Sequence, residues 1–141
     1  MQRCAAVGLA LIATFVVAAC ANRADGSCED LLAAIDKKPA NLEFVECKER
    51  SDLQGAPQQA SYRVIGAKAA GVERDLAKEL AIKTLHRTCC VWESVENSFR
   101  DKDGRLFVIA MATEETKIDA RAEWSKIPYF FVTVNRYRDD P

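Results

Sequence analysis

Several hallmarks of well-known functional classes are missing from this chain of 141 residues. It has one histidine, no Cys-x-x-Cys motif, no nucleotide-binding motif, no internal repeat and no low-complexity segment. Its 20 Lys and Arg side chains are balanced by 21 Asp and Glu, which leaves a net charge of -1. A near-neutral chain offers no basic patch for a nucleic acid, and a lone histidine offers no catalytic set. The sequence therefore predicts no nucleic-acid partner, no cofactor and no metal site.

A hydrophobic segment is present at the N-terminus, but it is short. Arg3 precedes an almost unbroken apolar run from Cys4 to Ala19, about fifteen residues, against the roughly 20 that cross a bilayer. A basic start followed by such a run is the form of a secretory signal. The run ends in Val17-Ala18-Ala19-Cys20, which resembles the lipobox of bacterial lipoproteins.

The lipobox resemblance implies that Cys20 is lipidated and anchors the chain to a membrane. We expect a signal peptide at 1–19, a lipidated tether at 20–27 and a single domain at 28–141 that faces the periplasm. Ala21 follows Cys20 where an aspartate resembles an inner-membrane retention signal. In a Gram-negative source, this favours the outer membrane.

Four cysteines remain in the predicted domain, namely Cys28, Cys47, Cys89 and Cys90. An even number of cysteines in an exported domain predicts a disulfide framework. We expect two disulfides and no free thiol. The favoured pairing joins Cys28 and Cys47 each to one member of the adjacent pair, because a ring between neighbours strains the peptide. The alternative, a Cys28–Cys47 bond with a ring at 89–90, would favour redox chemistry.

Hydrophobic periodicity predicts two helices and about five strands. Helices are expected at 28–37 and 68–85, and strands at 42–47, 60–66, 87–95, 106–113 and 129–137. The strand at 106–113 is apolar on both faces and is expected in the centre of the sheet. Tyr62 and Val64 share one face of their strand, and Phe130, Val132 and Val134 are expected to face the core. A turn is expected before Gly104, and a helical turn over Ala120–Lys126. The order α-β-β-α-β-β-β predicts an α+β fold, with two helices packed on one face of a mainly antiparallel sheet.

Several phrases together resemble a family of exported bacterial lipoproteins known as domain of unknown function 4952. The phrases are Cys28-Glu29-Asp30-Leu31-Leu32, Tyr62-Arg63-Val64-x-Gly66, Cys89-Cys90-x-Trp92-Glu93 and Trp124-x-x-Ile127-Pro128-Tyr129-Phe130. The resemblance covers most of residues 28–141 and implies an exported location and a shared fold. It implies no activity, substrate or catalytic residue.

Few residues qualify as candidates for a site. His86 is expected at the surface or at a helix end, and it is not assigned a catalytic role. The carboxylates around Asp101 and Asp103 are better explained by a hairpin turn than by calcium binding. Aromatic residues gather in the C-terminal half, and both faces of Tyr129-Phe130-Phe131 are apolar. We therefore name Trp124, Tyr129 and Phe131 as a candidate interaction surface.

These observations favour a membrane-anchored envelope lipoprotein whose domain binds an envelope protein or other component and is not an enzyme. One alternative is a thiol–disulfide or hydrolytic enzyme that uses Cys89-Cys90 or His86. A second alternative is an inhibitor of a host or competitor enzyme.

Overall fold

The computed structural model describes residues 28–138, which form one antiparallel sheet with helices on a single face. Within this range the sheet has seven strands in the spatial order β1-β2-β7-β6-β4-β3, and β5 also pairs with β6. The strands are β1 (Glu43–Glu49), β2 (Gln58–Ile65), β3 (His86–Thr88), β4 (Val91–Glu93), β5 (Asn97–Arg100), β6 (Leu106–Thr113) and β7 (Tyr129–Arg136).

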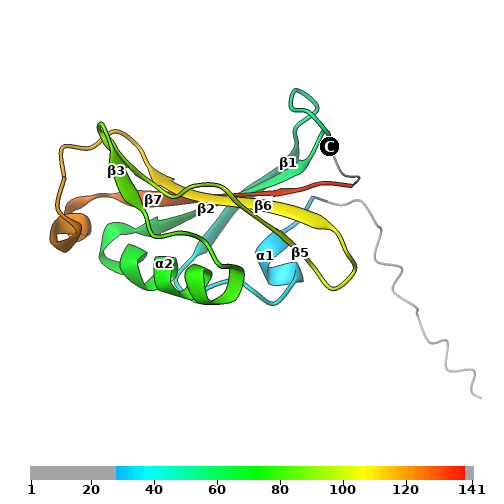
Figure 1. Ribbon diagram of the computed structural model, residues 1–141, viewed down its shortest axis with the longest axis horizontal. Coiled ribbons are helices and arrows are strands. Elements are labelled where there is room, and N and C mark those ends of the chain that lie inside the picture. Colours follow the sequence, from blue (N-terminus) through cyan, green and yellow to red (C-terminus); the bar gives the residue numbers. More distant parts are fainter. Residues whose placement is uncertain (1–27, 139–141) are drawn as a thin grey trace, which may run out of the picture.

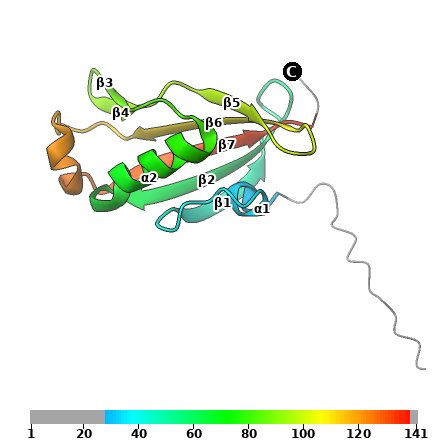
Figure 2. The same cartoon turned by 60° about the horizontal axis from the view of Figure 1, so that its bottom comes forward.

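Three helical segments accompany the strands in the described part of the chain. They are α1 (Leu31–Ala34), α2 (Gly66–Leu80) and the 3-10 helix η1 (Arg121–Lys126). In Figure 1, α1 and α2 both lie below the sheet, and Figure 2 shows α2 crossing its near face. Within residues 28–138, the opposite face carries no helix. At its two ends, the β3–β4 hairpin and the loop between β1 and β2 rise above the sheet (Figure 1).

The three central strands, β2, β6 and β7, alternate between buried and more accessible residues, except at the end of β7. Their inward side chains make the core together with Leu31, Leu32 and the apolar stripe of α2. Phe130, Val132 and Val134 are fully buried, which confirms their predicted orientation. β6 coincides with the predicted strand at 106–113, and its central place is confirmed, since β7 flanks one edge and β4 and β5 the other.

The predicted fold class is wrong in its architecture. The chain is mostly an antiparallel sheet of seven strands, with three short helical segments, in the described residues. One predicted strand, 87–95, is a hairpin of two short strands, because Cys89 has a positive φ of 51° and the chain reverses there. β5 escaped prediction because its only half-buried large apolar side chain is Phe99.

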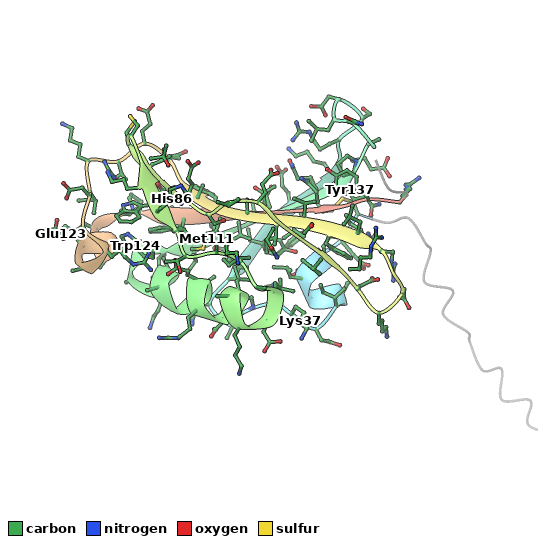
Figure 3. The ribbon with its side chains drawn as sticks, viewed as in Figure 1. Lys37, His86, Met111, Glu123, Trp124 and Tyr137 are labelled. Atoms are coloured by element: carbon green, nitrogen blue, oxygen red, sulfur yellow. A yellow bond between two sulfur atoms is a disulfide. The ribbon has the colours of Figure 1, made fainter. Side chains whose placement is uncertain are left out.

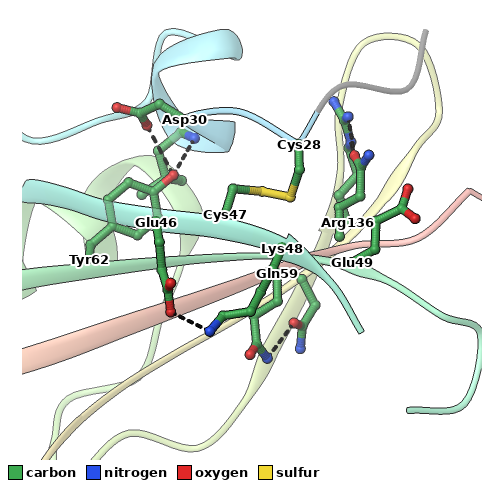
Figure 4. Close-up of a disulfide and its surroundings, with 12 residues drawn as sticks. Cys28, Asp30, Glu46, Cys47, Lys48, Glu49, Gln59, Tyr62 and Arg136 are labelled. Carbon is green, nitrogen blue, oxygen red and sulfur yellow. Dashed lines mark hydrogen bonds and ion pairs between the residues drawn. A yellow bond between two sulfur atoms is a disulfide. The ribbon is translucent and has the colours of Figure 1, made fainter. Parts of the chain in front are cut away.

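The first helix is held in place by a capping residue and a disulfide. Asp30 accepts a hydrogen bond from the Ala33 N–H at 3.1 Å, as an N-cap does. Cys28 is bonded to Cys47 of β1, with their Cα atoms 5.3 Å apart (Figure 4). Cys89 and Cys90 are free thiols. The favoured pairing and the expectation of no free thiol are therefore wrong.

Close packing between α2 and η1 explains why residue 66 is a glycine. A Cβ atom at this position would lie 2.0 Å from the Trp124 carbonyl oxygen and 2.2 Å from that of Ile127. Only a residue without a side chain lets the two backbones approach in this way. This approach fixes η1 against the end of the sheet and buries Trp124, which is 3% exposed.

Candidate functional site

A cavity of about 620 Å³ opens between α1, the end of α2 and the β5–β6 hairpin. Its apolar lining includes Ile35, Leu80 and Phe99. Phe99 stacks on Phe107 with ring centroids 5.1 Å apart, so this wall is anchored in the core. The volume falls in the range of small-molecule sites.

The charged rim of this cavity is engaged in contacts within the domain. Lys37 pairs with Glu79 at 2.6 Å, and the hydrogen bond from Lys37 lowers the pKa of the Glu79 carboxyl. Arg105 pairs with Asp101 at 3.0 Å and with Asp103 at 2.6 Å. These pairs hold parts of the cavity walls together and neutralise part of the charge on the rim. The predicted hairpin turn is confirmed here, since Gly104 has a φ of 81°.

The helix-free face of the sheet carries a cluster of exposed apolar side chains on two neighbouring strands. Ile65 of β2 is 49% exposed, and Tyr129 and Phe131 of β7 are each 37% exposed. Ile65 lies opposite Tyr129 in the strand register, and Phe131 lies between Arg63 and Ala112. We call Ile65, Tyr129 and Phe131 the open-face cluster. Side chains of this size are usually found inside a protein or at an interface.

Charges beside the open-face cluster are paired with one another. Arg63 donates two hydrogen bonds to Glu43, at 2.8 and 2.9 Å, and its guanidinium lies 4.9 Å from the centre of the Tyr129 ring. The Arg63 hydrogen bond lowers the pKa of the Glu43 carboxyl. Further along β1, Lys48 pairs with Glu46 at 2.6 Å. The surroundings of the cluster are therefore polar but locally neutral.

Of the three residues predicted to form an interaction surface, two are exposed together and the third is buried. Tyr129 and Phe131 lie on the helix-free face, but Trp124 does not, because it packs in the core against Trp92 and Phe130 at centroid distances of 5.3 and 4.7 Å. Figure 3 places Trp124, a residue of η1, on the helix side of the sheet. Trp124 was misassigned because an aromatic residue in a polar segment looks exposed from sequence alone.

Ile65 was missed as a member of this surface. It is the last residue but one of the predicted strand at 60–66, in which Tyr62 and Val64 were placed on one face. Residues 63 and 65 share the other face, because side chains alternate along a strand. That alternation, read together with the apolar side chain of Ile65, was the available signal.

Cys89 and Cys90 form the two-residue turn of the β3–β4 hairpin. Cys89 is exposed and Cys90 is half-buried. The Thr116 N–H donates to the Cys90 carbonyl at 2.7 Å and fixes the turn to the loop before η1. Arg87 supports the same loop, since its guanidinium donates to the Thr116 carbonyl at 2.8 Å and also to the Ile118 carbonyl. A rigid base thus presents the two thiols.

His86 is exposed at the start of β3 and lies opposite Glu93 in the register (Figure 3). It belongs to neither the cavity lining nor the open-face cluster. Across residues 28–138, no group of three or more His, Cys, Asp or Glu side chains is arranged to hold a metal ion.

The buried carboxylate of Glu73 makes contacts that stabilise the fold. It accepts a hydrogen bond from the Leu85 N–H at 2.7 Å and pairs with Arg121 of η1. The Arg121 guanidinium also lies 4.1 Å from the centre of the Trp124 ring. These contacts join α2, η1 and the segment before β3.

Comparison with known proteins gives one match. The family described as a domain of unknown function (DUF4952) matches residues 17–92, more than half of the chain. The matched segment runs from the predicted lipobox to β4 and contains the disulfide, α2 and the two free cysteines. No curated protein and no solved structure matches the chain. In the part that the structure describes, no helix is long and apolar enough to cross a membrane.

Proposed function

Because the chain belongs to the DUF4952 family, whose description assigns no activity, we propose its function from its own residues: an exported, membrane-anchored lipoprotein whose domain binds a protein partner. The open-face cluster carries this proposal. Its three large apolar side chains stay accessible to solvent although two helices cover the other face of the sheet. We propose a binding domain rather than a hydrolase.

The chemistry of this surface favours a protein partner that presents a compact apolar patch. The neighbouring charges of Arg63, Glu43, Glu46 and Lys48 are already paired within the domain. A polyanion such as a nucleic acid or an acidic polysaccharide needs unpaired cations, whereas an apolar patch needs an uncharged contact with a polar rim. Aromatic side chains are also common anchors at protein interfaces.

Site-specific photo-crosslinking in intact cells tests the binding surface. A photoreactive residue replaces Phe131 in one full-length variant and Asp75, on the outer side of α2, in the matched control. We expect one discrete protein adduct from position 131, lost when Ile65→Asp is added, and no such adduct from position 75. Adducts that are the same from both positions, or that survive Ile65→Asp, would contradict the proposal.

The membrane anchor has its own test. Cys20 and residues 1–27 lie outside the described residues, so the proposal rests on the basic start, the apolar run and the Val-Ala-Ala-Cys junction. We expect Cys20→Ala to release the protein from the membrane fraction. Mass spectrometry of the native N-terminus provides the direct check, and an unmodified N-terminus beyond Cys20 would overturn this part of the proposal.

A further inference from the structure

The two free thiols occupy a backbone position that does not suit cysteine. Cys89 has a φ of 51°, in the left-handed region that Gly, Asn and Asp adopt at least cost in two-residue hairpin turns. A cysteine at this position makes the turn less stable than one of those residues would. Local strain of this kind is typical of functional positions.

We propose that Cys89 and Cys90 form a thiol–disulfide exchange site that reacts with exposed disulfides of other molecules. Both cysteines are free and neither is buried, at the tip of a hairpin that rises beyond the sheet on its helix-free side (Figure 1). A protruding tip reaches a disulfide on a large partner as easily as on a small molecule. This activity goes beyond the proposed binding function.

The reaction proceeds in two balanced steps. The Cys89 thiolate attacks one sulfur of the target disulfide, forming a mixed disulfide at Cys89 and releasing the first target thiol. Cys90 then loses its proton and attacks the Cys89 sulfur, closing a ring between the neighbours and releasing the second target thiol. The cysteine pair loses two electrons, and the target disulfide gains them.

The surroundings of the two thiols assign the attacking role to Cys89. Cys89 is the more exposed of the two, and access governs the first attack. A hydrogen bond between the two side chains raises the pKa of the Cys90 thiol, with smaller contributions from partial burial and from the charges of Cys89 and Glu115. Arg87 opposes this rise. Cys90 is thus suited to the later, resolving step.

The two cysteine pairs of the domain differ in how easily a disulfide fits them. Cys28 and Cys47 have Cα atoms 5.3 Å apart, within the range of about 4.4–6.8 Å that disulfides prefer. Neighbouring residues are held about 3.8 Å apart across a trans peptide, which is too close for that geometry. A ring at 89–90 is therefore strained and readily reduced by thiols such as glutathione, two of which are oxidised to a disulfide, so this pair can return to its free form while the Cys28–Cys47 bond stays intact.

Redox titration of the full chain tests the proposal. The protein, purified in detergent, is equilibrated with mixtures of reduced and oxidised glutathione, quenched with acid, alkylated and mapped without reduction. We expect oxidising mixtures to yield a peptide in which Cys89 and Cys90 are linked. As the ratio of reduced to oxidised glutathione is raised, this link should open at a ratio at least about tenfold lower than the ratio that opens Cys28–Cys47. Failure to form this link at any ratio would overturn the ring step.

Two variants separate the roles of the thiols. Cys90→Ser leaves Cys89 without its resolving partner, so the reaction should stop at a stable mixed disulfide with glutathione on Cys89. Cys89→Asn keeps a residue suited to positive φ, and the remaining Cys90 should form a mixed disulfide with oxidised glutathione, releasing one reduced glutathione, at least about tenfold more slowly than Cys89 does in Cys90→Ser. Equal reaction rates in the two variants would show two independent surface thiols and would refute the proposal. Circular dichroism of both variants establishes that the fold is retained.

Discussion

The two faces of the sheet differ in how far their apolar side chains are buried. On the covered face, the inward residues of β2, β6 and β7 are buried beneath α1 and α2, and the capping network of Asp30 and the Cys28–Cys47 bond fasten α1 to the sheet. On the open face, Ile65, Tyr129 and Phe131 stay accessible, and nearby charges pair across exposed strands. Both faces use apolar side chains, but only one of them buries these side chains within the chain itself.

This difference separates stability from recognition. Apolar area removed from water stabilises the fold by roughly 25 cal/mol per Å², so the covered face supplies most of the folding free energy. Apolar side chains on the open face contribute less to folding, because they stay accessible to water. Burying them against a partner would instead contribute to binding. Substitutions on the covered face should therefore lower the free energy of unfolding, whereas substitutions on the open face should weaken binding and leave stability nearly unchanged.

Phe130 and Phe131 are adjacent residues of the same type on opposite faces, and they offer the sharpest test. Phe130 is fully buried, whereas Phe131 is 37% exposed. We expect Phe130→Ala to cost about 3–5 kcal/mol in the free energy of unfolding and Phe131→Ala less than about 1 kcal/mol. Denaturant unfolding measures both. Equal losses would mean that the open face contributes to folding as much as the core.

The second test removes the bond that fastens α1 to β1. Cys28 and Cys47 are 19 residues apart in the sequence, and in the chain-entropy model closing a loop of this length is worth about 3 kcal/mol. The double variant Cys28→Ser, Cys47→Ser should lose about that much stability in thermal or denaturant unfolding. The matched variant Cys89→Ser, Cys90→Ser should lose almost none. A comparable loss in both variants would indicate that the two pairs share a structural role.

Local patterns in the sequence account for much of this fold. Alternating apolar side chains made β2 and β7 predictable, a run that is apolar on both faces predicted β6, and the inward side of β7 was correctly placed. The hairpin at Cys89-Cys90 was not predictable, because the turn contains no Gly, Asn or Pro to mark it. Without that turn, two short strands read as one, and the number of strands was too low.

The cysteine pairing and the site depended on contacts that no local pattern encodes. Cys28 and Cys47 meet because the chain folds back after α1, and the spacing of the cysteines alone allowed three pairings. The exposure of Tyr129 and Phe131 was predictable, because one face of a strand with apolar residues on both sides can be left uncovered by the helices. Trp124 could not be placed in the same way, since its burial depends on the close approach of η1 to Gly66.

Gly66 and Gly71 both belong to α2. Gly66 lies against η1, whereas Gly71 lies on a side of the helix with more open space. At Gly66 a methyl group would overlap two backbone carbonyl oxygens, whereas at Gly71 the nearest atom outside the local helix backbone is 3.8 Å away. We expect Gly66→Ala to cost about 1–3 kcal/mol or more. Gly71→Ala should stabilise the protein by about 0.5–1 kcal/mol, because alanine favours the helix. Stabilisation by Gly66→Ala would contradict the close approach of α2 to η1.

Tyr62 and Tyr129 provide the smallest contrast between the faces, and it depends on pH. The buried Tyr62 hydroxyl accepts from the Leu32 N–H at 2.9 Å and donates to Asp30 Oδ1 at 3.0 Å (Figure 4). Tyr62→Phe leaves that N–H without its partner and should cost about 1–2 kcal/mol near neutral pH. Tyr129→Phe, on the open face, should cost less than about 0.5 kcal/mol.

Burial raises the pKa of Tyr62 above its usual value of about 10, and the Asp30 carboxylate adds to this rise, although the Leu32 N–H opposes it. The folded state therefore holds the phenol proton more tightly than the unfolded state does. This contribution is fully present below about pH 10, the unfolded value, and is lost as the pH rises from there towards the folded value. Between pH 9 and 11, stability should thus fall more steeply for the wild type and Tyr129→Phe than for Tyr62→Phe, as measured by denaturant unfolding at each pH. Parallel curves for all three proteins would show that the Tyr62 hydroxyl is as accessible to solvent as the open face.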